Sequence, residues 1–154
     1  MTTYYLDTSA LSKRYVQETG TAWISALADT AANHTFLTAR VTMVEVYSAL
    51  ARRKREGSVP VADCEVAERA FTAHSATEYE FVELDLAVVN LTRDLLGRHP
   101  LRAYDAVQLS SAIIVNQALQ AAHLAPLIFL SADGRLNTAA AAEGLAVDDP
   151  NLHP

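Results

Sequence analysis

Short apolar runs alternate with helical patterns along the whole 154-residue chain, and this alternation limits the folds open to it. The runs that predict β-strands are Tyr4–Leu6, Thr35–Ala39, Glu80–Leu84, Leu127–Ser131 and the short Leu145–Val147. Strands separated by helices form parallel sheets, because a helix must carry the chain back before the next strand begins. We therefore expect an α/β fold, a three-layer α/β/α sandwich around a mostly parallel central sheet of four to five strands.

The segments between the strands have helical apolar spacing or helix-ending residues. They are Thr8–Gln17, Thr21–Ala32, Val41–Glu56, Pro60–Thr77, Asp85–Leu96, Ala103–His123 and Asp133–Glu143. Glycines at 57, 97 and 144 are expected to end the third, fifth and last of these helices. The chain contains no linker, repeat or low-complexity block, so residues 1–154 are predicted to form a single domain.

The composition indicates a globular protein of the reducing cytoplasm. Hydrophobic residues make up 51% of the chain and charged residues 19%, which argues against disorder. Cys64 is the single cysteine, so an intrachain disulfide and a zinc site with cysteine spacing are both excluded. The N-terminus has no basic region followed by a long apolar stretch, so we expect no signal peptide.

Two other function classes are disfavoured by charge and polarity. Residues 106–132 contain no Asp, Glu, Lys or Arg, but Gln108, Asn116 and Pro126 interrupt them, so we expect a buried helix and strand and no membrane partner. The net charge of −6 argues against binding nucleic acid through a broad basic face. An enzyme that contacts RNA through a metal and a small basic patch remains compatible with that charge.

Four acidic residues lie at or just after the points where a strand ends and a helix begins: Asp7, Glu45, Asp105 and Asp133. In an open parallel sheet these points line the carboxyl edge, where ligands bind. Carboxylates gathered there repel one another unless protons or cations neutralise them. A hard divalent cation such as Mg²⁺ or Mn²⁺ prefers such oxygen ligands, so the pattern predicts a metal site.

Each acid also has a purely structural interpretation. Asp7 could cap a helix, although Thr8 and Ser9 cap equally well and would leave its carboxylate available. Glu45 and Asp105 could simply complement a helix dipole, and Asp133 could belong to an Asp-Gly turn. Position alone also selects Asp85, which we interpret as a plain helix N-cap because an outlying strand carries its end away from the sheet centre.

Four segments around these acids resemble the PIN domain, specifically the VapC-type toxin ribonucleases of toxin–antitoxin pairs. They are Tyr5–Leu11, Val44–Val46, Tyr104–Leu109 and Phe129–Leu136, in the order and spacing of that family. The resemblance implies a PIN-like fold and a Mg²⁺- or Mn²⁺-dependent endoribonuclease. It implies that the metal-site acids are Asp7, Glu45, Asp105 and Asp133. Ser9 resembles the family's hydroxyl neighbour of the site, and Thr8 and Ser131 are supporting candidates, with serine at 131 where threonine is frequent.

The resemblance also implies partners: an RNA substrate, a cognate antitoxin protein that covers the site, and a second copy of the chain in a homodimer. Basic residues must contact the RNA backbone. Arg102 and Arg135 lie nearest the acids in sequence and are the better candidates for phosphate contact. The Arg52–Arg55 and Lys13–Arg14 clusters are interpreted mainly as cations at helix C-termini.

Three other functions compete with the nuclease. A haloacid dehalogenase-type phosphatase has a second Asp two residues after its nucleophile, but Ser9 occupies that position. A phospho-receiver domain needs a lysine late in the chain, whereas the two lysines are Lys13 and Lys54. A PIN-like RNA-binding or scaffold module with little or no nuclease activity remains the alternative, and retention of all four acids argues for the enzyme.

Overall fold

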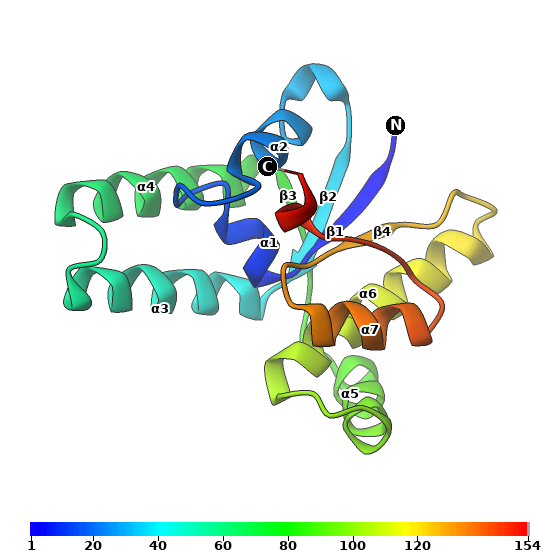
Figure 1. Cartoon of the computed structure of the whole chain (residues 1–154). Helices are drawn as coiled ribbons and strands as arrows, with labels where there is room; N and C mark the ends of the chain where they lie inside the picture. Colours follow the sequence, from blue (N-terminus) through cyan, green and yellow to red (C-terminus); the bar gives the residue numbers. More distant parts are fainter. Residues whose placement is uncertain (154) are drawn as a thin grey trace.

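The computed structural model describes residues 1–153, apart from the side chain of Thr30, and has a five-stranded parallel sheet at its centre (Figure 1). The strands are β1 (Thr3–Leu6), β2 (Thr35–Ala39), β3 (Tyr79–Val82), β4 (Ile128–Leu130) and β5 (Ala146–Asp148), in the order β3-β2-β1-β4-β5. In the central strand β1, Tyr4 is in register with Phe36 of β2 and Ile128 of β4. Pro154, the last residue of the predicted domain, lies outside the described residues.

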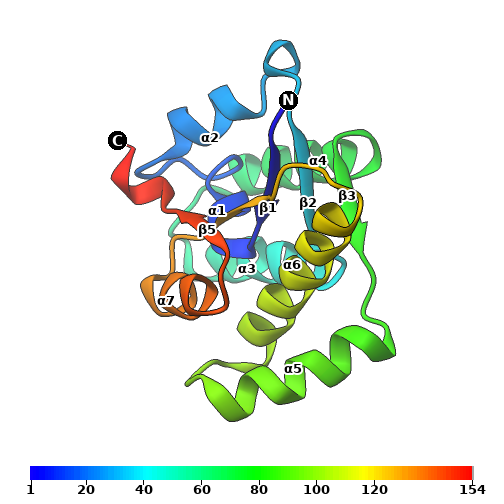
Figure 2. The ribbon, with the colours of Figure 1, turned by 90° about the vertical axis from the view of Figure 1, so that its right-hand side faces the viewer.

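Helices cover both faces of this sheet (Figure 2). They are α1 (Thr8–Ser12), α2 (Thr21–Leu27), the 3₁₀ turn η1 (Thr30–Ala32), α3 (Val41–Glu56), α4 (Val61–Thr77), α5 (Leu86–Arg98), α6 (Ala103–Ala121), α7 (Gly134–Ala142) and the 3₁₀ turn η2 (Pro150–Leu152). The predicted three-layer α/β/α architecture is confirmed.

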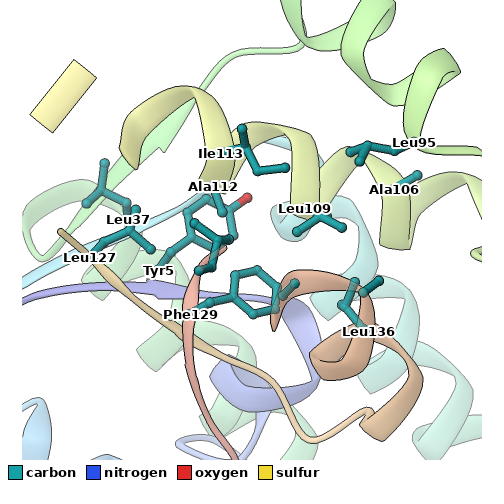
Figure 3. Packing of buried hydrophobic residues seen from close by; sticks show 13 residues of the cluster. Tyr5, Leu37, Leu95, Ala106, Leu109, Ala112, Ile113, Leu127, Phe129 and Leu136 are labelled. Carbon is teal, nitrogen blue, oxygen red and sulfur yellow. The ribbon is translucent and has the colours of Figure 1, made fainter. Parts of the chain in front are cut away.

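Alternation along the strands divides the core into two layers, because successive side chains point to opposite faces. Tyr5 and Phe129 face α6 and α7, and their rings stack with centroids 5.6 Å apart (Figure 3). Leu6 and Leu130 face the other way and pack with residues of α1 to α4. A strand flanked on both faces by buried residues must be apolar along its whole length, and this is the pattern that made the strands recognisable.

The long helix α6 is the buried element that the charge-free stretch predicts. Leu109 and Ala112 are fully buried in the same cluster as Tyr5 and Phe129 (Figure 3). Within the described residues, no helix combines the length and apolar character needed to span a membrane.

Several predicted helix boundaries differ from the structure, most of them by one or two residues. The first helix ends at Ser12 and not at Gln17, because the chain tightens into turns there and the buried Lys13 Nζ donates to the Thr19 carbonyl oxygen at 2.9 Å. The second predicted helix breaks after Leu27 and resumes as η1. Gly97 does not end α5, which continues to Arg98. The helix ends there because the residue before Pro100 is restricted to extended backbone, which His99 adopts.

Candidate active site

All four predicted acids line one open cavity of about 480 Å³ at the carboxyl edge of the sheet. Asp7 comes from the end of β1, Glu45 from the second turn of α3, Asp105 from the first turn of α6, and Asp133 from the N-cap of α7. Ser9 and Thr8 line the same cavity. Residues more than 120 positions apart therefore contribute to a single site, as the strand order requires.

Asp7 is the most enclosed of these acids, with only 5% of its surface exposed. Its Oδ1 accepts hydrogen bonds from the Ser9 hydroxyl at 2.7 Å and from the Ala10 amide at 3.0 Å, and its Oδ2 accepts one from the Ser131 hydroxyl at 3.1 Å. Asp7 is thus the N-cap of α1, as its structural interpretation allowed, and Thr8 and Ser9 are not used as caps. Asp7 both caps α1 and lines the cavity.

Ser9 and Ser131 join the ends of the two central strands around this carboxylate. The Ser9 hydroxyl also accepts a hydrogen bond from the Ala132 amide at 2.8 Å, and the Ser131 hydroxyl accepts one from the Asp133 amide at 3.0 Å. Each hydroxyl therefore has its proton directed to Asp7 and its lone pairs directed to backbone. This arrangement holds Asp7 in one orientation and explains why small hydroxyl residues occupy both positions.

Burial raises the pKa of the Asp7 carboxyl from 3.8 to about 7 in the metal-free protein. Hydrogen bonds from Ala10, Ser9 and Ser131 oppose this rise, and the nearby charge of Glu45 adds to it. A group that burial makes costly to ionise gains most from a cation beside it. The electrostatics of Asp7 therefore favour a positively charged ligand in the cavity.

Glu45 is held by two neighbours. Its Oε1 accepts hydrogen bonds from the Thr8 hydroxyl at 2.7 Å and from the Gln108 amide at 3.0 Å. Gln108 is 2% exposed, and its amide oxygen accepts a hydrogen bond from the Tyr5 hydroxyl at 2.9 Å. Its nitrogen also donates to Thr42 at 2.8 Å. Sequence reasoning missed Gln108, although a glutamine three residues after Asp105 in an apolar helix placed it on the same helical face.

Asp105 lies in the first turn of α6, as its structural interpretation predicted, whereas Asp133 was expected in an Asp-Gly turn and instead caps α7. Both acids also line the cavity. The Asp105 Oδ2 accepts a hydrogen bond of 3.4 Å from the Arg102 amide at the start of α6. The Asp133 Oδ1 caps α7 by accepting bonds from the amides of Arg135 at 2.8 Å and Leu136 at 3.4 Å. A helix-capping role and a place in the site are therefore compatible for these acids.

The donor set of the cavity fits a hard divalent cation held partly through water. The acids offer only oxygen, which is the ligand atom that Mg²⁺ and Mn²⁺ prefer. Across residues 1–153, however, no three His, Cys, Asp or Glu side chains form a group that could hold a metal ion together. Since Mg²⁺ retains several waters and uses only one or two carboxylates, acids that surround a cavity without meeting at one point suit it.

Four basic side chains line the same cavity as the acids: Lys13, Arg52, Arg53 and Arg102. Sequence reasoning identified Arg102 but interpreted the other three as helix-end cations. Arg135, the other predicted phosphate contact, instead lies 3.7 Å from Asp133 Oδ2. Glu18 also lines the cavity and lies 3.6 Å from Lys13, so the three arginines are the basic side chains that remain beside the acids.

Comparison with known proteins identifies the family. The family model for the PIN domain matches residues 4–141 of this chain. The chain belongs to the PIN-domain family. Two curated Mycobacterium tuberculosis proteins, ribonuclease VapC45 of strain CDC 1551 / Oshkosh and ribonuclease VapC49 of strain ATCC 25618 / H37Rv, are each 33% identical to it over 97% of both chains. The resemblance inferred from the four acidic segments is confirmed.

Solved structures show the same PIN fold at low sequence identity. A chain of the VapBC2 complex from Rickettsia felis, bound to a DNA fragment from its promoter, superposes with a TM-score of 0.63 and 12% identity, covering 96% of this chain and 98% of that one. A chain of FitAB bound to the IR36 DNA fragment gives a TM-score of 0.63 and 14% identity, covering 96% and 94%. At these identities the likeness concerns the fold.

Asp85 has the N-cap role that was predicted for it. It is exposed, and its Oδ1 accepts a hydrogen bond from the Val88 amide at 2.9 Å. It does not line the cavity, because it follows β3, the edge strand farthest from β4 and β5. Strand order therefore separates Asp85 from the four acids that line the cavity.

Proposed function

We propose that this protein is an endoribonuclease that hydrolyses RNA phosphodiester bonds with Mg²⁺ or Mn²⁺, and that it is the toxin of a toxin–antitoxin pair. Its membership of the PIN-domain family and its likeness over nearly full length to two proteins named ribonuclease VapC support this class. The observation that carries the proposal is the cavity that contains Asp7, Glu45, Asp105 and Asp133 together with four basic side chains.

The carboxylates are proposed to hold the cation, with Asp7 as the central ligand. Ser9 and Ser131 orient Asp7, and Thr8 and Gln108 orient Glu45, so the two side chains are fixed before a ligand arrives. When bound, the divalent cation lowers the pKa of water and offsets the charge that develops on the phosphoryl oxygens.

The basic side chains are proposed to hold the phosphodiester backbone. Arg52, Arg53 and Arg102 reach the cavity from α3 and from the start of α6. An arginine fork binds phosphate oxygens in two places at once, which fixes the orientation of the bond to be cut. In the reaction, water adds to phosphorus and the bond from phosphorus to the leaving ribose oxygen breaks. Among the described residues, no histidine or cysteine lines the cavity to act as an alternative nucleophile.

Two protein partners are proposed on separate grounds. The solved structures of similar fold are complexes named VapBC2 and FitAB, which supports a cognate antitoxin as partner. The compartment proposed for the pair is the reducing cytoplasm. A homodimer is supported by one face of α5, where Leu86, Val89 and Leu96 are 73%, 45% and 42% exposed. Apolar residues three and seven positions apart form a single stripe, which is typical of a protein contact.

The alternative is a PIN-like module that binds RNA or other partners without cutting RNA. Such a module has no need of a buried carboxylate whose ionisation is costly. Because Asp7 is 5% exposed and is surrounded by hydrogen-bond donors aimed at its charged form, its retention favours the enzyme.

Cleavage of pooled RNA by the purified protein tests the proposal. Wild type should cut RNA with Mg²⁺ or Mn²⁺ and stop when EDTA is added, and Asp7→Asn should reduce the rate by about a hundredfold or more, because the substitution removes the central charge of the site. Asp85→Asn is the matched control, since asparagine caps a helix as well as aspartate does, and its rate should stay within about twofold of wild type. Wild type that cuts no RNA with either metal, or equal rates for Asp7→Asn and wild type, would refute the proposal.

A further inference from the structure

A second cavity of about 500 Å³ adjoins the acidic one. The two cavities share Thr8, Glu45, Ala49 and Arg52 in their linings, and Tyr104 lies only in the second. Glu45 is thus a common wall between the proposed cation site and a neighbouring hollow. A volume of this size falls in the range of about 300–1,000 Å³ that small-ligand pockets occupy.

Tyr104 is the aromatic residue of this second cavity. It is the second residue of α6, directly before Asp105, and it is 52% exposed. Among the described residues, its hydroxyl takes part in no side-chain hydrogen bond, whereas Tyr5, Tyr15, Tyr47 and Tyr79 all do. The Tyr104 ring is therefore not part of the core, and its hydroxyl is not bound to a neighbouring side chain. Tyr104 is available to contact a ligand in the cavity.

The rest of the lining comes from one side of α3. Glu45, Ala49 and Arg52 are spaced by four and three residues, so they follow one another along the helix, with Ser48 beside them. Ser48 and Ala49 have small side chains, so space remains between α3 and Tyr104. Arg52 is exposed and lies one helical turn after Ala49. Within residues 1–153 the Arg52 guanidinium has no ion-pair partner, unlike Lys13, Arg14 and Lys54. An aromatic ring and an unpaired guanidinium therefore line one cavity.

We propose that this second cavity binds one nucleobase of a single-stranded RNA, with Tyr104 stacked on the base and Arg52 bound to the adjoining phosphate. The inference rests on the proposed nuclease function and adds a subsite to it. Aromatic stacking combined with a basic contact to the backbone is a general mode by which proteins hold single strands, and it accepts any base because every base has a π-face. A double strand is excluded from this mode, since its bases are already stacked on one another.

The charges of the lining favour RNA over a second copy of the chain as the occupant. The centre of a protein–protein contact is depleted of charged residues, whereas both Glu45 and Arg52 line this cavity, on the same side of α3. The apolar stripe of Leu86, Val89 and Leu96 on α5 is a better surface for a homodimer. A nucleotide next to the cleaved phosphodiester would use both Tyr104 and Arg52, because its base can stack on the aromatic ring and its phosphate can bind the guanidinium.

Tyr104→Ala, Tyr104→Phe and the control Leu124→Ala test the subsite in the full-length protein. Leu124 is 58% exposed just beyond the C-terminal end of α6, whereas Tyr104 lies at its N-terminal end. With single-stranded RNA and Mn²⁺, Tyr104→Ala should raise KM about tenfold with kcat within about twofold of wild type, which is the size of effect expected from one stacked base. Tyr104→Phe should retain the wild-type KM because the ring remains, and so should Leu124→Ala.

A binding measurement separates this inference from the nuclease proposal. Short RNAs with 2-aminopurine at each position in turn are mixed with the protein in EDTA, so that no bond is cut. Stacking on Tyr104 should quench the fluorescence at one position with wild type and Tyr104→Phe, but not with Tyr104→Ala. Equal quenching with all three proteins overturns the subsite whether or not RNA is cleaved. A fall in sedimenting mass for Tyr104→Ala also overturns it, because the ring would then belong to a contact between copies. Absence of cleavage by wild type contradicts only the nuclease.

Discussion

Asp7 and Asp85 have the same local structure, but Asp7 is buried and Asp85 is exposed. Each follows a strand, and each caps the next helix through one carboxylate oxygen, which accepts a hydrogen bond from the amide three residues later at 3.0 Å and 2.9 Å respectively. Asp85 is exposed, and its carboxylate accepts no other hydrogen bond among the described residues. Asp7 is 5% exposed and also accepts hydrogen bonds from the hydroxyls of Ser9 and Ser131.

The difference comes from strand order. β1 has neighbours on both sides, so the end of β4 brings Ser131 to Asp7, and α3, which follows β2, brings Glu45 to the same cavity. β3 pairs only with β2, and the end of an edge strand gathers fewer side chains. A strand-to-helix junction therefore supplies an acid, and its place in the sheet decides whether that acid joins a site or only caps a helix.

Asp7→Asn should stabilise the metal-free protein while it abolishes cleavage, which is the largest effect expected. Raising the pKa of Asp7 from 3.8 to about 7 corresponds to about 4 kcal/mol of unfolding free energy lost when the buried carboxyl ionises. The native state retains its proton longer than the unfolded state does, so stability falls as the pH rises from about 4 to about 7. Thermal unfolding in EDTA should therefore place Asp7→Asn above wild type, by roughly 10 °C at about pH 8.

The advantage of the Asp7→Asn protein should shrink as the pH is lowered, and it should vanish below about pH 4, where Asp7 is protonated in both states. Asp85→Asn serves as the control and should follow wild type at every pH, since Asp85 is exposed. A destabilised Asp7→Asn protein at about pH 8 would show that the two acids differ less than their burial indicates.

The sequence was sufficient to locate the acids but not the residues that support them. Asp7, Glu45, Asp105 and Asp133 were predicted because strand-like runs and helix signals are local patterns, and parallel strands place their ends on one edge by rule. Asp85 was interpreted as a plain N-cap because its strand was expected to be an outlying one, and the strand that it follows, β3, is an edge strand. Gln108 was missed because its partners Tyr5, Thr8 and Glu45 lie 63 to 103 residues away.

The basic residues were only partly predictable for the same physical reason. Arg102 lies three residues from Asp105 and lines the cavity, whereas Arg135 pairs with Asp133, and the phosphate contact of Arg102 stays a prediction. Arg52 enters the cavity because α3 carries Glu45, Ala49 and Arg52 on one side, and Arg53 follows it in the sequence. Which side of α3 faces the cavity depends on how the helix packs against the sheet. The predicted length of the first helix was wrong because the chain turns after Ser12, where the Lys13 side chain donates a hydrogen bond to the Thr19 carbonyl oxygen.

Gln108→Leu should lower both stability and cleavage, with an effect of intermediate size. The substitution leaves the hydroxyl of the fully buried Tyr5 without its acceptor, which costs about 2 kcal/mol, and removes one of the two groups that orient Glu45. Cleavage should fall about tenfold at saturating RNA, a loss expected when a positioned acid becomes mobile. Thermal unfolding and single-turnover rates measure the two effects separately.

Thr92→Val provides a matched control for the Gln108 substitution. Thr92 of α5 shares a buried hydrogen bond of 2.8 Å with Ser110 of α6, on the same helix as Gln108 but outside the cavity. Its loss should reduce stability by about 1 kcal/mol and leave the cleavage rate unchanged, because no acid depends on it. If both variants lose activity in proportion to their stability, Gln108 has no special role in positioning Glu45.

Asp85→Ala should have the smallest effect and marks the other end of the comparison. Removing the side-chain oxygen that caps α5 leaves the Val88 amide to water and should cost about 1 kcal/mol, or about 3 °C in Tm for a chain of this size. Cleavage at a temperature where the variant is fully folded should equal that of wild type, because the end of the edge strand β3 contributes nothing to the cavity. A loss of cleavage larger than the loss of folded protein would mean that acids at both junctions serve the site, and strand order would then not explain which of them function.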